Sequence, residues 1–136
     1  MQKILLAANF TETRLKALKL ACMQLKVLLK EVKKEELLQP VGYLAGIPGI
    51  APVEAVYSED TQLSEMIFMS GFTRPDLDRM LAAIKKGSLK EIKLKAMLTP
   101  YNASWSVLKL LGEIGQEHAY MHGRKAAKPK HLADQN

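Results

Sequence analysis

The sequence is poor in the residues on which covalent and metal chemistry depends. It has one cysteine, Cys22, and three histidines among 136 residues. A single cysteine cannot form a disulfide within the chain, which favours a reducing compartment. The sequence contains no glycine-rich phosphate loop, no catalytic-triad spacing and no cysteine–histidine metal cluster. We therefore expect no metal and no cofactor, and the sequence supplies no catalytic residue.

Long hydrophobic runs are also missing. The apolar run Ile4–Ala8 is too short for a secretory signal peptide, and no stretch approaches the roughly 20 apolar residues of a membrane-spanning helix. Aromatic residues make up only 6%, whereas 48% of the residues are hydrophobic and 25% are charged, as is ordinary for a globular protein. We expect a cytoplasmic protein with no membrane contact, folded as one domain over residues 1–123.

The net charge of +6 is unevenly distributed along the chain. Residues 1–65 carry eight basic and eight acidic groups, whereas residues 66–136 carry twelve basic and six acidic groups. Part of the excess lies in residues 124–136, which we expect to form a basic, disordered tail. The folded part is therefore only mildly basic, which weakens the case for nucleic-acid binding from overall charge alone.

Hydrophobic periodicity predicts alternating strands and helices. Each of the two clearest helices carries one apolar stripe and begins at a threonine that can cap its first turn, Thr11 or Thr73. Cys22 lies in the first stripe, so we interpret it as a small core residue. The alternation favours an α/β fold with a small, mainly parallel sheet of about four strands covered by helices. The predicted strands are Lys3–Ala8, Val27–Val32, Met66–Gly71 and Ile92–Leu98.

The stretch Ile92–Trp105 joins the last predicted strand to the last predicted helix. Pro100 lacks an N–H group and should end the strand at Thr99. Asn102 can cap a helix running from Ala103 to about Met121 by accepting a hydrogen bond from the next turn.

Two parts of the chain resemble each other. The segments ANFTETRLKAL and SGFTRPDLDRM align at an offset of 62 residues, which matches Phe10 with Phe72 and Thr11 with Thr73. This predicts two similar strand–helix–strand–helix halves, residues 1–46 and 66–123. We expect residues 47–65 to be an irregular connection that packs on the domain or forms a short extra strand near Val53–Tyr57.

Several motifs together resemble a known family. They are the segment Gln39–Gly46 (QPVGYLAG), a strand that ends in Gly71-Phe72, and the segment Leu98–Trp105 (LTPYNASW) with its Thr-Pro-x-Asn-x-x-Trp element. Over about residues 3–118 the chain resembles a small bacterial family catalogued only as a domain of unknown function. The resemblance implies a compact bacterial cytoplasmic protein and supplies no activity, cofactor or catalytic residue.

The strongest candidate site follows from the predicted sheet. Parallel strands deliver their carboxyl ends to one edge, where helix N-termini present free N–H groups. Hydroxyl and amide side chains at three such junctions could meet there and hold a small polar or anionic ligand. The alternative is that they only cap helices and close turns. The candidate ligand-binding residues are Thr11, Ser70, Thr73, Thr99 and Asn102.

A second candidate is a cluster of lysines around the last predicted strand, which could contact phosphate backbones. The alternative is a solvated surface whose lysines protect an edge strand from pairing. No aromatic residue interleaves with these lysines, which are Lys85, Lys86, Lys90, Lys93 and Lys95.

The last predicted helix leaves two further questions open. His118 and His122 have a spacing that can hold a metal, but no third ligand accompanies them, so we interpret them as a solvated helix end. Gly112 and Gly115 form a narrow strip that would permit close approach of either the sheet or a partner subunit. The sequence does not decide between the two, so a homodimer is one of the alternatives.

We expect a non-enzymatic binding or protein-interaction module whose partners the sequence does not indicate. A weak nucleic-acid binder and an enzyme with an unrecognised site stay open as alternatives.

Overall fold

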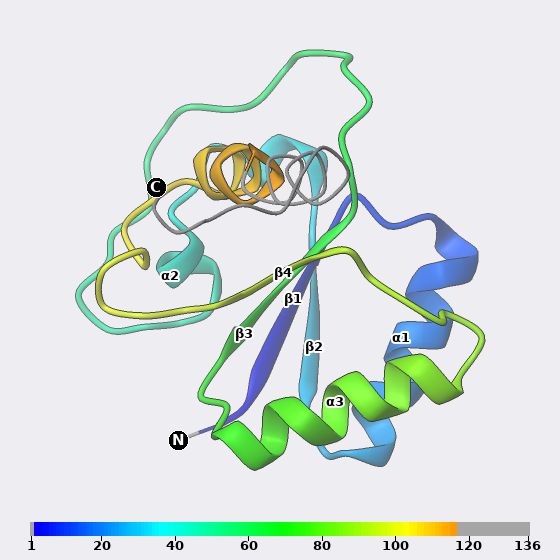
Figure 1. Ribbon diagram of the computed structural model, residues 1–136. Helices are drawn as coiled ribbons and strands as arrows, with labels where there is room; N and C mark the ends of the chain where they lie inside the picture. Colours follow the sequence, from blue (N-terminus) through cyan, green and yellow to red (C-terminus); the bar gives the residue numbers. More distant parts are fainter. Residues whose placement is uncertain (1, 117–136) are drawn as a thin grey trace, which may run out of the picture.

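The computed structural model describes residues 2–116, which form a four-stranded mixed sheet with helices on both faces (Figure 1). The strand order is β2-β1-β3-β4. The predicted α/β fold with a small, mostly parallel sheet is confirmed. The strands are β1 (Ile4–Ala8), β2 (Leu28–Val32), β3 (Met66–Ser70) and β4 (Leu94–Met97). The helices are α1 (Glu12–Gln24), the 3₁₀ helix η1 (Lys34–Glu36), α2 (Val41–Leu44), α3 (Arg74–Lys86) and a final helix over residues 107–116.

Strand direction changes at the centre of the sheet. β1 pairs in parallel with β2, and β3 pairs in parallel with β4, but β1 and β3 are antiparallel and place Ile4 opposite Ser70. The carboxyl ends of β1 and β2 therefore lie at one end of the sheet, and those of β3 and β4 lie at the other. The expectation that all strands deliver their carboxyl ends to one edge is wrong.

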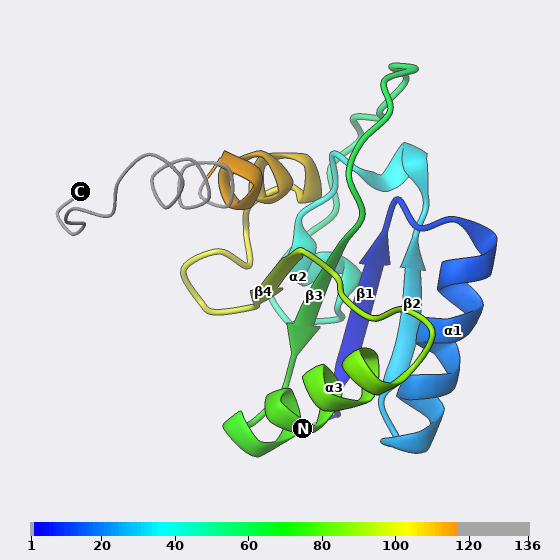
Figure 2. The same cartoon turned by 45° about the vertical axis from the view of Figure 1, so that its right-hand side comes forward.

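The sheet separates two apolar layers. Leu5, Ala7, Ile67 and Met69 pack under α1 and α3, which cover the same face in both views of the ribbon (Figures 1 and 2). The alternate strand residues, including Leu6 and Phe68, pack with α2 and the final helix on the opposite face. Because side chains of a strand alternate between its faces, both sides of these buried strands are apolar.

Local capping chemistry sets where α1 and α3 begin. The Thr11 hydroxyl accepts a hydrogen bond from the Arg14 N–H at 3.3 Å, as predicted. At α3, the Thr73 hydroxyl accepts from the Asp76 N–H at 3.2 Å, and the Asp76 carboxylate accepts from the Thr73 N–H at 2.8 Å. This reciprocal capping box confirms the predicted start of α3.

The final helix begins at residue 107, so its predicted start at Ala103 is wrong. The Asn102 side chain accepts from the Thr99 N–H at 2.9 Å and donates to the Met97 carbonyl at 3.2 Å. It therefore closes the turn that follows β4 instead of capping a helix. Ser106 takes the capping role, because its hydroxyl accepts from the Lys109 N–H at 3.0 Å.

Residues 47–65 form an irregular connection, drawn as the long loop in Figure 1, that packs without a strand. The Gln39 side chain both donates to the Val53 carbonyl, at 2.7 Å, and accepts from its N–H, at 2.9 Å. Tyr57 is buried among the apolar residues near α2. The segment thus stabilises its path by side-chain contacts, and no strand forms near Val53–Tyr57.

The full strand–helix–strand–helix repeat stays a prediction. β3 and α3 each begin and end 62 residues after β1 and α1. The elements that follow the second strand of each pair differ, because η1 and α2 follow β2 whereas the longer final helix follows β4. Within residues 2–116, no helix is long and apolar enough to cross a membrane.

Candidate ligand site

A cavity of about 720 Å³ lies at the carboxyl ends of β3 and β4, and we call it the β3/β4 cavity. One wall of the cavity is a row of residues that crosses the three adjacent strands β1, β3 and β4. Ser70 at the end of β3 lies opposite Ile4 of β1, and Leu98 follows β4 and donates its N–H to the Met69 carbonyl at 2.8 Å. The sheet register therefore builds one wall of the cavity.

The opposite wall consists of two turns that are far apart in the sequence. Residues 45–50 follow α2, and residues 99–103 follow β4. Hydrogen bonds fasten these two regions together: the Gly42 N–H donates to the Ala103 carbonyl and the Val41 N–H donates to the Trp105 carbonyl, each at 2.8 Å. The segments Gln39–Gly46 and Leu98–Trp105, singled out in the sequence, thus lie side by side.

Gly42 permits this close approach. A Cβ atom at this position would lie 2.8 Å from the Ala103 carbonyl oxygen and 2.6 Å from the Ile50 side chain. Both distances are shorter than van der Waals contact, so any larger residue would push the two turns apart.

The lining of the β3/β4 cavity is chiefly apolar, with isoleucine, leucine, proline and alanine side chains, and none of its residues within 2–116 carries an ionisable side chain. Its polar side chains are Gln2, Ser70 and Thr99. Ser70 is only 7% exposed, and its hydroxyl forms no hydrogen bond with another of residues 2–116. Such an unpaired buried hydroxyl is unusual, because most buried polar groups have a partner.

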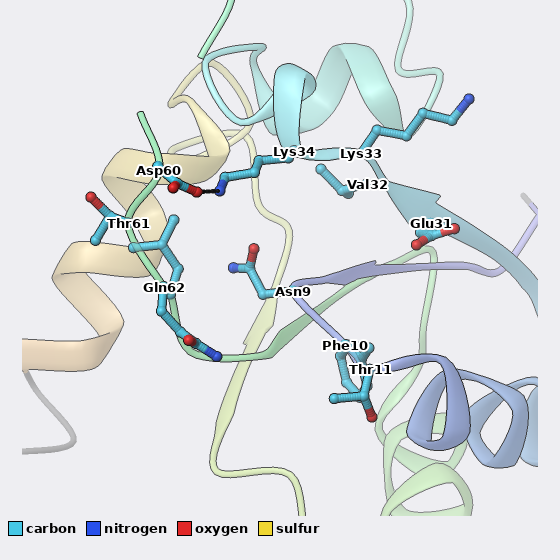
Figure 3. A pocket seen from close by; sticks show the side chains of 11 residues that line it. Asn9, Phe10, Thr11, Glu31, Val32, Lys33, Lys34, Asp60, Thr61 and Gln62 are labelled. Carbon is cyan, nitrogen blue, oxygen red and sulfur yellow. Dashed lines mark ion pairs between the residues drawn. The ribbon is translucent and has the colours of Figure 1, made fainter. Parts of the chain in front are cut away.

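A second cavity, of about 430 Å³, lies at the carboxyl ends of β1 and β2, and we call it the β1/β2 cavity. Figure 3 shows Asn9 at its centre and the ion pair between Lys34 and Asp60 spanning one side, with an N–O distance of 3.5 Å. Lys33 extends away from Asn9. This cavity is lined chiefly by polar and charged side chains, which come from residues 9–11, residues 31–34 and residues 60–63 of the irregular connection.

Three polar side chains of the β1/β2 cavity, those of Asn9, Thr11 and Asp60, have partners within the protein. The Asn9 amide donates to the Ser64 carbonyl at 2.9 Å, and the Thr11 hydroxyl caps α1. The Asp60 side chain is fully exposed, so its ion pair with Lys34 is screened by water. A hydrogen bond to a ligand would therefore stabilise these groups less than it would stabilise a buried group that has no partner.

The structure separates the five ligand-binding residues predicted from the sequence. Ser70 and Thr99 line the β3/β4 cavity, whereas Thr11 lines the β1/β2 cavity at the other end of the sheet. Thr73 and Asn102 are engaged in the α3 capping box and in the turn after β4.

Residues 65–121 match DUF3783, a domain of unknown function. The resemblance to a family catalogued only as a domain of unknown function is confirmed over these residues, although it was predicted for about residues 3–118 and the match does not test its individual motifs. A search of the curated proteins and a search of the solved structures gave no match.

The DUF3783 segment contributes only part of the β3/β4 cavity. It supplies Ser70, Leu98 and Thr99, whereas Ile4 and the 45–50 turn lie outside it. Sequence reasoning missed these outside residues as part of a site. The QPVGYLAG motif is the sequence feature that comes closest to indicating the 45–50 turn, because it ends at Gly46, which has a positive φ of 79° and lies in that turn.

The predicted lysine cluster is only partly brought together. Lys85, Lys90 and Lys95 line a surface hollow of about 400 Å³ beside Glu91, between α3 and β4. Lys86 and Lys93 do not line it, although Lys93 lines a neighbouring hollow. The Lys95 ammonium also donates to the Ile92 carbonyl, which holds it against the segment just before β4.

Cysteine, histidine and carboxylate side chains are the remaining groups that could carry covalent or metal chemistry. Cys22 is buried under the sheet, and burial raises the pKa of its thiol to about 12, so it is protonated and unreactive at neutral pH. Among residues 2–116, no three histidine, cysteine, aspartate or glutamate side chains are grouped to hold a metal. His118 and His122 lie outside the described residues, as does the basic tail over residues 124–136.

Gly112 and Gly115 do not line a tight contact with the sheet. A Cβ atom at either position would meet no described atom within 4 Å. Their predicted role in close packing against the domain's own sheet therefore finds no support in residues 2–116.

Proposed function

We propose that this protein is a non-enzymatic binding module that holds a small ligand in the β3/β4 cavity. The observation that carries the proposal is the buried Ser70 hydroxyl, which lines a chiefly apolar cavity without a hydrogen-bond partner among residues 2–116. Small-molecule sites typically combine an apolar lining with a few convergent polar groups and a volume of about 300–1,000 Å³. The volume of about 720 Å³ falls within that range.

The residue types of the lining favour binding over catalysis. The lining residues, all within residues 2–116, offer two hydroxyls and one amide but no carboxylate, imidazole or amine. A general acid or base needs a group whose pKa is close to the working pH. The cavity therefore supplies shape and hydrogen bonding, which are the requirements of a binding site.

A fragment screen by NMR on the full chain tests the proposal. We expect bound fragments to shift the amide signals of Ser70, Gly71 and Thr99. Replacing the half-buried Ile47, which lines the cavity, by tryptophan should fill the space and abolish the shifts. Thr61→Trp is the matched control, because it places the same side chain at the β1/β2 cavity. Fragments that leave these amides unchanged, or that bind equally to Ile47→Trp, would refute the proposal.

A second candidate function is weak binding of nucleic acid. It is supported by the three lysines Lys85, Lys90 and Lys95 around one hollow. An electrophoretic shift of mixed single-stranded RNA that weakens with salt, and that Lys85→Glu/Lys90→Glu removes, would favour it. Lys16→Glu/Lys19→Glu, which reverses two exposed charges on α1, is the control.

A further inference from the structure

We infer that the ligand of the β3/β4 cavity is an uncharged, chiefly apolar small molecule with one oxygen that hydrogen-bonds to Ser70. This inference rests on the proposed function and adds the chemical class of the ligand. It replaces the polar or anionic ligand that the sequence alone suggested.

The charge balance of the cavity disfavours an ionic ligand. Among residues 2–116, no ionisable side chain lines the β3/β4 cavity. Two lysines near it, Lys3 beside Ile4 in the sequence and Lys30 beside Leu44, are bound to other groups. Lys3 is paired with the Asp76 carboxylate at 3.2 Å, and Lys30 donates to the Leu44 carbonyl at 3.1 Å. A charged group that enters an apolar cavity loses its hydration and finds no opposite charge, which is costly. A neutral ligand avoids that cost.

The hydroxyls at the carboxyl ends of β3 and β4 favour a neutral hydrogen-bonding atom on the ligand, such as an oxygen. The Thr99 oxygen accepts from the Asn102 N–H at 3.2 Å, so its own O–H proton is available to donate. The Ser70 hydroxyl has no partner among residues 2–116 and can both donate and accept. A hydroxyl or carbonyl oxygen would satisfy Ser70. A hydrocarbon of the same shape would leave it unpaired, which is how a polar site discriminates between similar ligands.

Four probes that share a phenyl ring but differ in the polarity and charge of its substituent test the class of ligand. We use toluene, benzyl alcohol, benzoate and benzylammonium, and we follow the amide signals of the lining residues in NMR titrations of the full chain. Benzyl alcohol should bind more tightly than each of the other three probes. Ser70→Ala should weaken benzyl alcohol by about 3- to 10-fold, the usual value of one hydrogen bond, and leave toluene unchanged. Ser70→Thr keeps the hydroxyl and should retain the preference, and Thr61→Ala at the other cavity should change neither probe.

The other possible results distinguish a wrong ligand class, a wrong role for Ser70 and a wrong proposed function. Tighter binding of benzoate or benzylammonium at the same amides would overturn the neutral class but leave the binding function intact. Equal affinity for toluene and benzyl alcohol, or an equal loss of both in Ser70→Ala, would overturn the role of Ser70. If none of the four probes binds while other fragments do, the ligand class is wrong. If no fragment binds, the proposed function itself fails.

Discussion

Gly42 is the residue on which the geometry of the candidate site most directly depends. It donates its N–H to the Ala103 carbonyl at 2.8 Å, and a Cβ atom on it would lie equally close to that carbonyl oxygen. The side chain of Ile50 can rotate away from an added methyl group, but the backbone of Ala103 cannot. The absence of a side chain at Gly42 therefore sets the separation of the two turns that form one wall of the β3/β4 cavity.

Gly42→Ala should destabilise the protein because the added methyl group overpacks this contact. We expect a loss of about 1–3 kcal/mol in the free energy of unfolding, measured by denaturant titration. Gly112→Ala is the control: its Cβ would meet no described atom within 4 Å, and it lies in the final helix. There alanine should raise the stability by up to about 1 kcal/mol. Equal effects of the two substitutions would show that the contact at Gly42 is not tight.

Capping residues show how far single positions can be predicted from the sequence. Thr11 and Thr73 were identified correctly because their hydrogen bonds connect residues only three positions apart. Asn102 was assigned to the wrong role, since Ser106 is an equally good capping residue four positions later. The choice depended on Thr99, whose N–H engages the Asn102 side chain and closes the turn first.

At the scale of elements, one ion pair joins the start of α1 to the residue before β3, and a second joins the start of α3 to the residue before β1. Arg14 of α1 binds Glu65, which precedes β3, with N–O distances of 2.6 and 2.8 Å. Asp76 of α3 binds Lys3, which precedes β1, at 3.2 Å. Arg14 and Asp76 are 62 positions apart, as are Lys3 and Glu65, and the charges are reversed. Two equivalent contacts with opposite polarity thus stabilise the antiparallel junction of β1 and β3.

Arg14→Ala should loosen this junction more than the loss of an ordinary surface ion pair. Besides Glu65, the Arg14 guanidinium donates to the carbonyls of Leu89 and Glu91, so it connects α1, β3 and the segment before β4. We expect a loss of about 1–2 kcal/mol of unfolding free energy, since the group is one third exposed and makes several charged hydrogen bonds.

Arg74→Ala provides the comparison for this element. The Arg74–Asp78 pair lies within α3, has a 3.5 Å separation and is largely exposed. Its loss should change the stability by less than about 0.5 kcal/mol in the same denaturant titration. A similar small effect of Arg14→Ala would mean that the guanidinium does not hold the three elements together.

Strand identity was predictable, but strand faces and directions were less so. In the predicted strand Ile92–Leu98 every second residue is apolar, which predicts that these residues share one face. Leu94, Ala96 and Leu98 do pack on one face, whereas Ile92 packs with the α1 and α3 layer. Ile92 precedes β4, and Lys90 adopts a positive φ of 65°, so the backbone turns before the strand begins. A pattern of alternating residues does not record such a turn.

At the scale of the whole molecule, the direction of β3 decides which predicted site residues can meet. It follows from the route of the irregular connection over residues 47–65, which contains no periodic pattern. Each parallel pair could be predicted from its strand–helix–strand pattern, because such crossovers are short and regular. How the two pairs join could not, and this is why Thr11 lies apart from Ser70 and Thr99.

Asp76, which pairs with Lys3 at the junction of β1 and β3, makes the stability of the whole molecule depend on pH. The Asp76 carboxylate accepts hydrogen bonds from the Thr73 N–H and hydroxyl, each at 2.8 Å, and from Lys3 and Arg79. These bonds, led by the Thr73 N–H, hold the pKa of Asp76 far below its usual value of about 3.9. Because the folded pKa is lowered, Asp76 contributes stability above its unfolded pKa and loses it as the pH falls through the folded value.

Asp76→Asn should therefore lower the melting temperature most at neutral pH, and its difference from the unmodified protein should shrink as the pH falls from about 5 toward 2. Thermal unfolding followed by circular dichroism at a series of pH values measures this. Asp78→Asn is the control, because the Asp78 carboxylate is 65% exposed and contacts only Arg74 among the ion pairs of residues 2–116. It should cause a small change at every pH. A difference for Asp76→Asn that stays constant across the pH range would show that the amide disturbs packing and that the charge of Asp76 does not stabilise the junction.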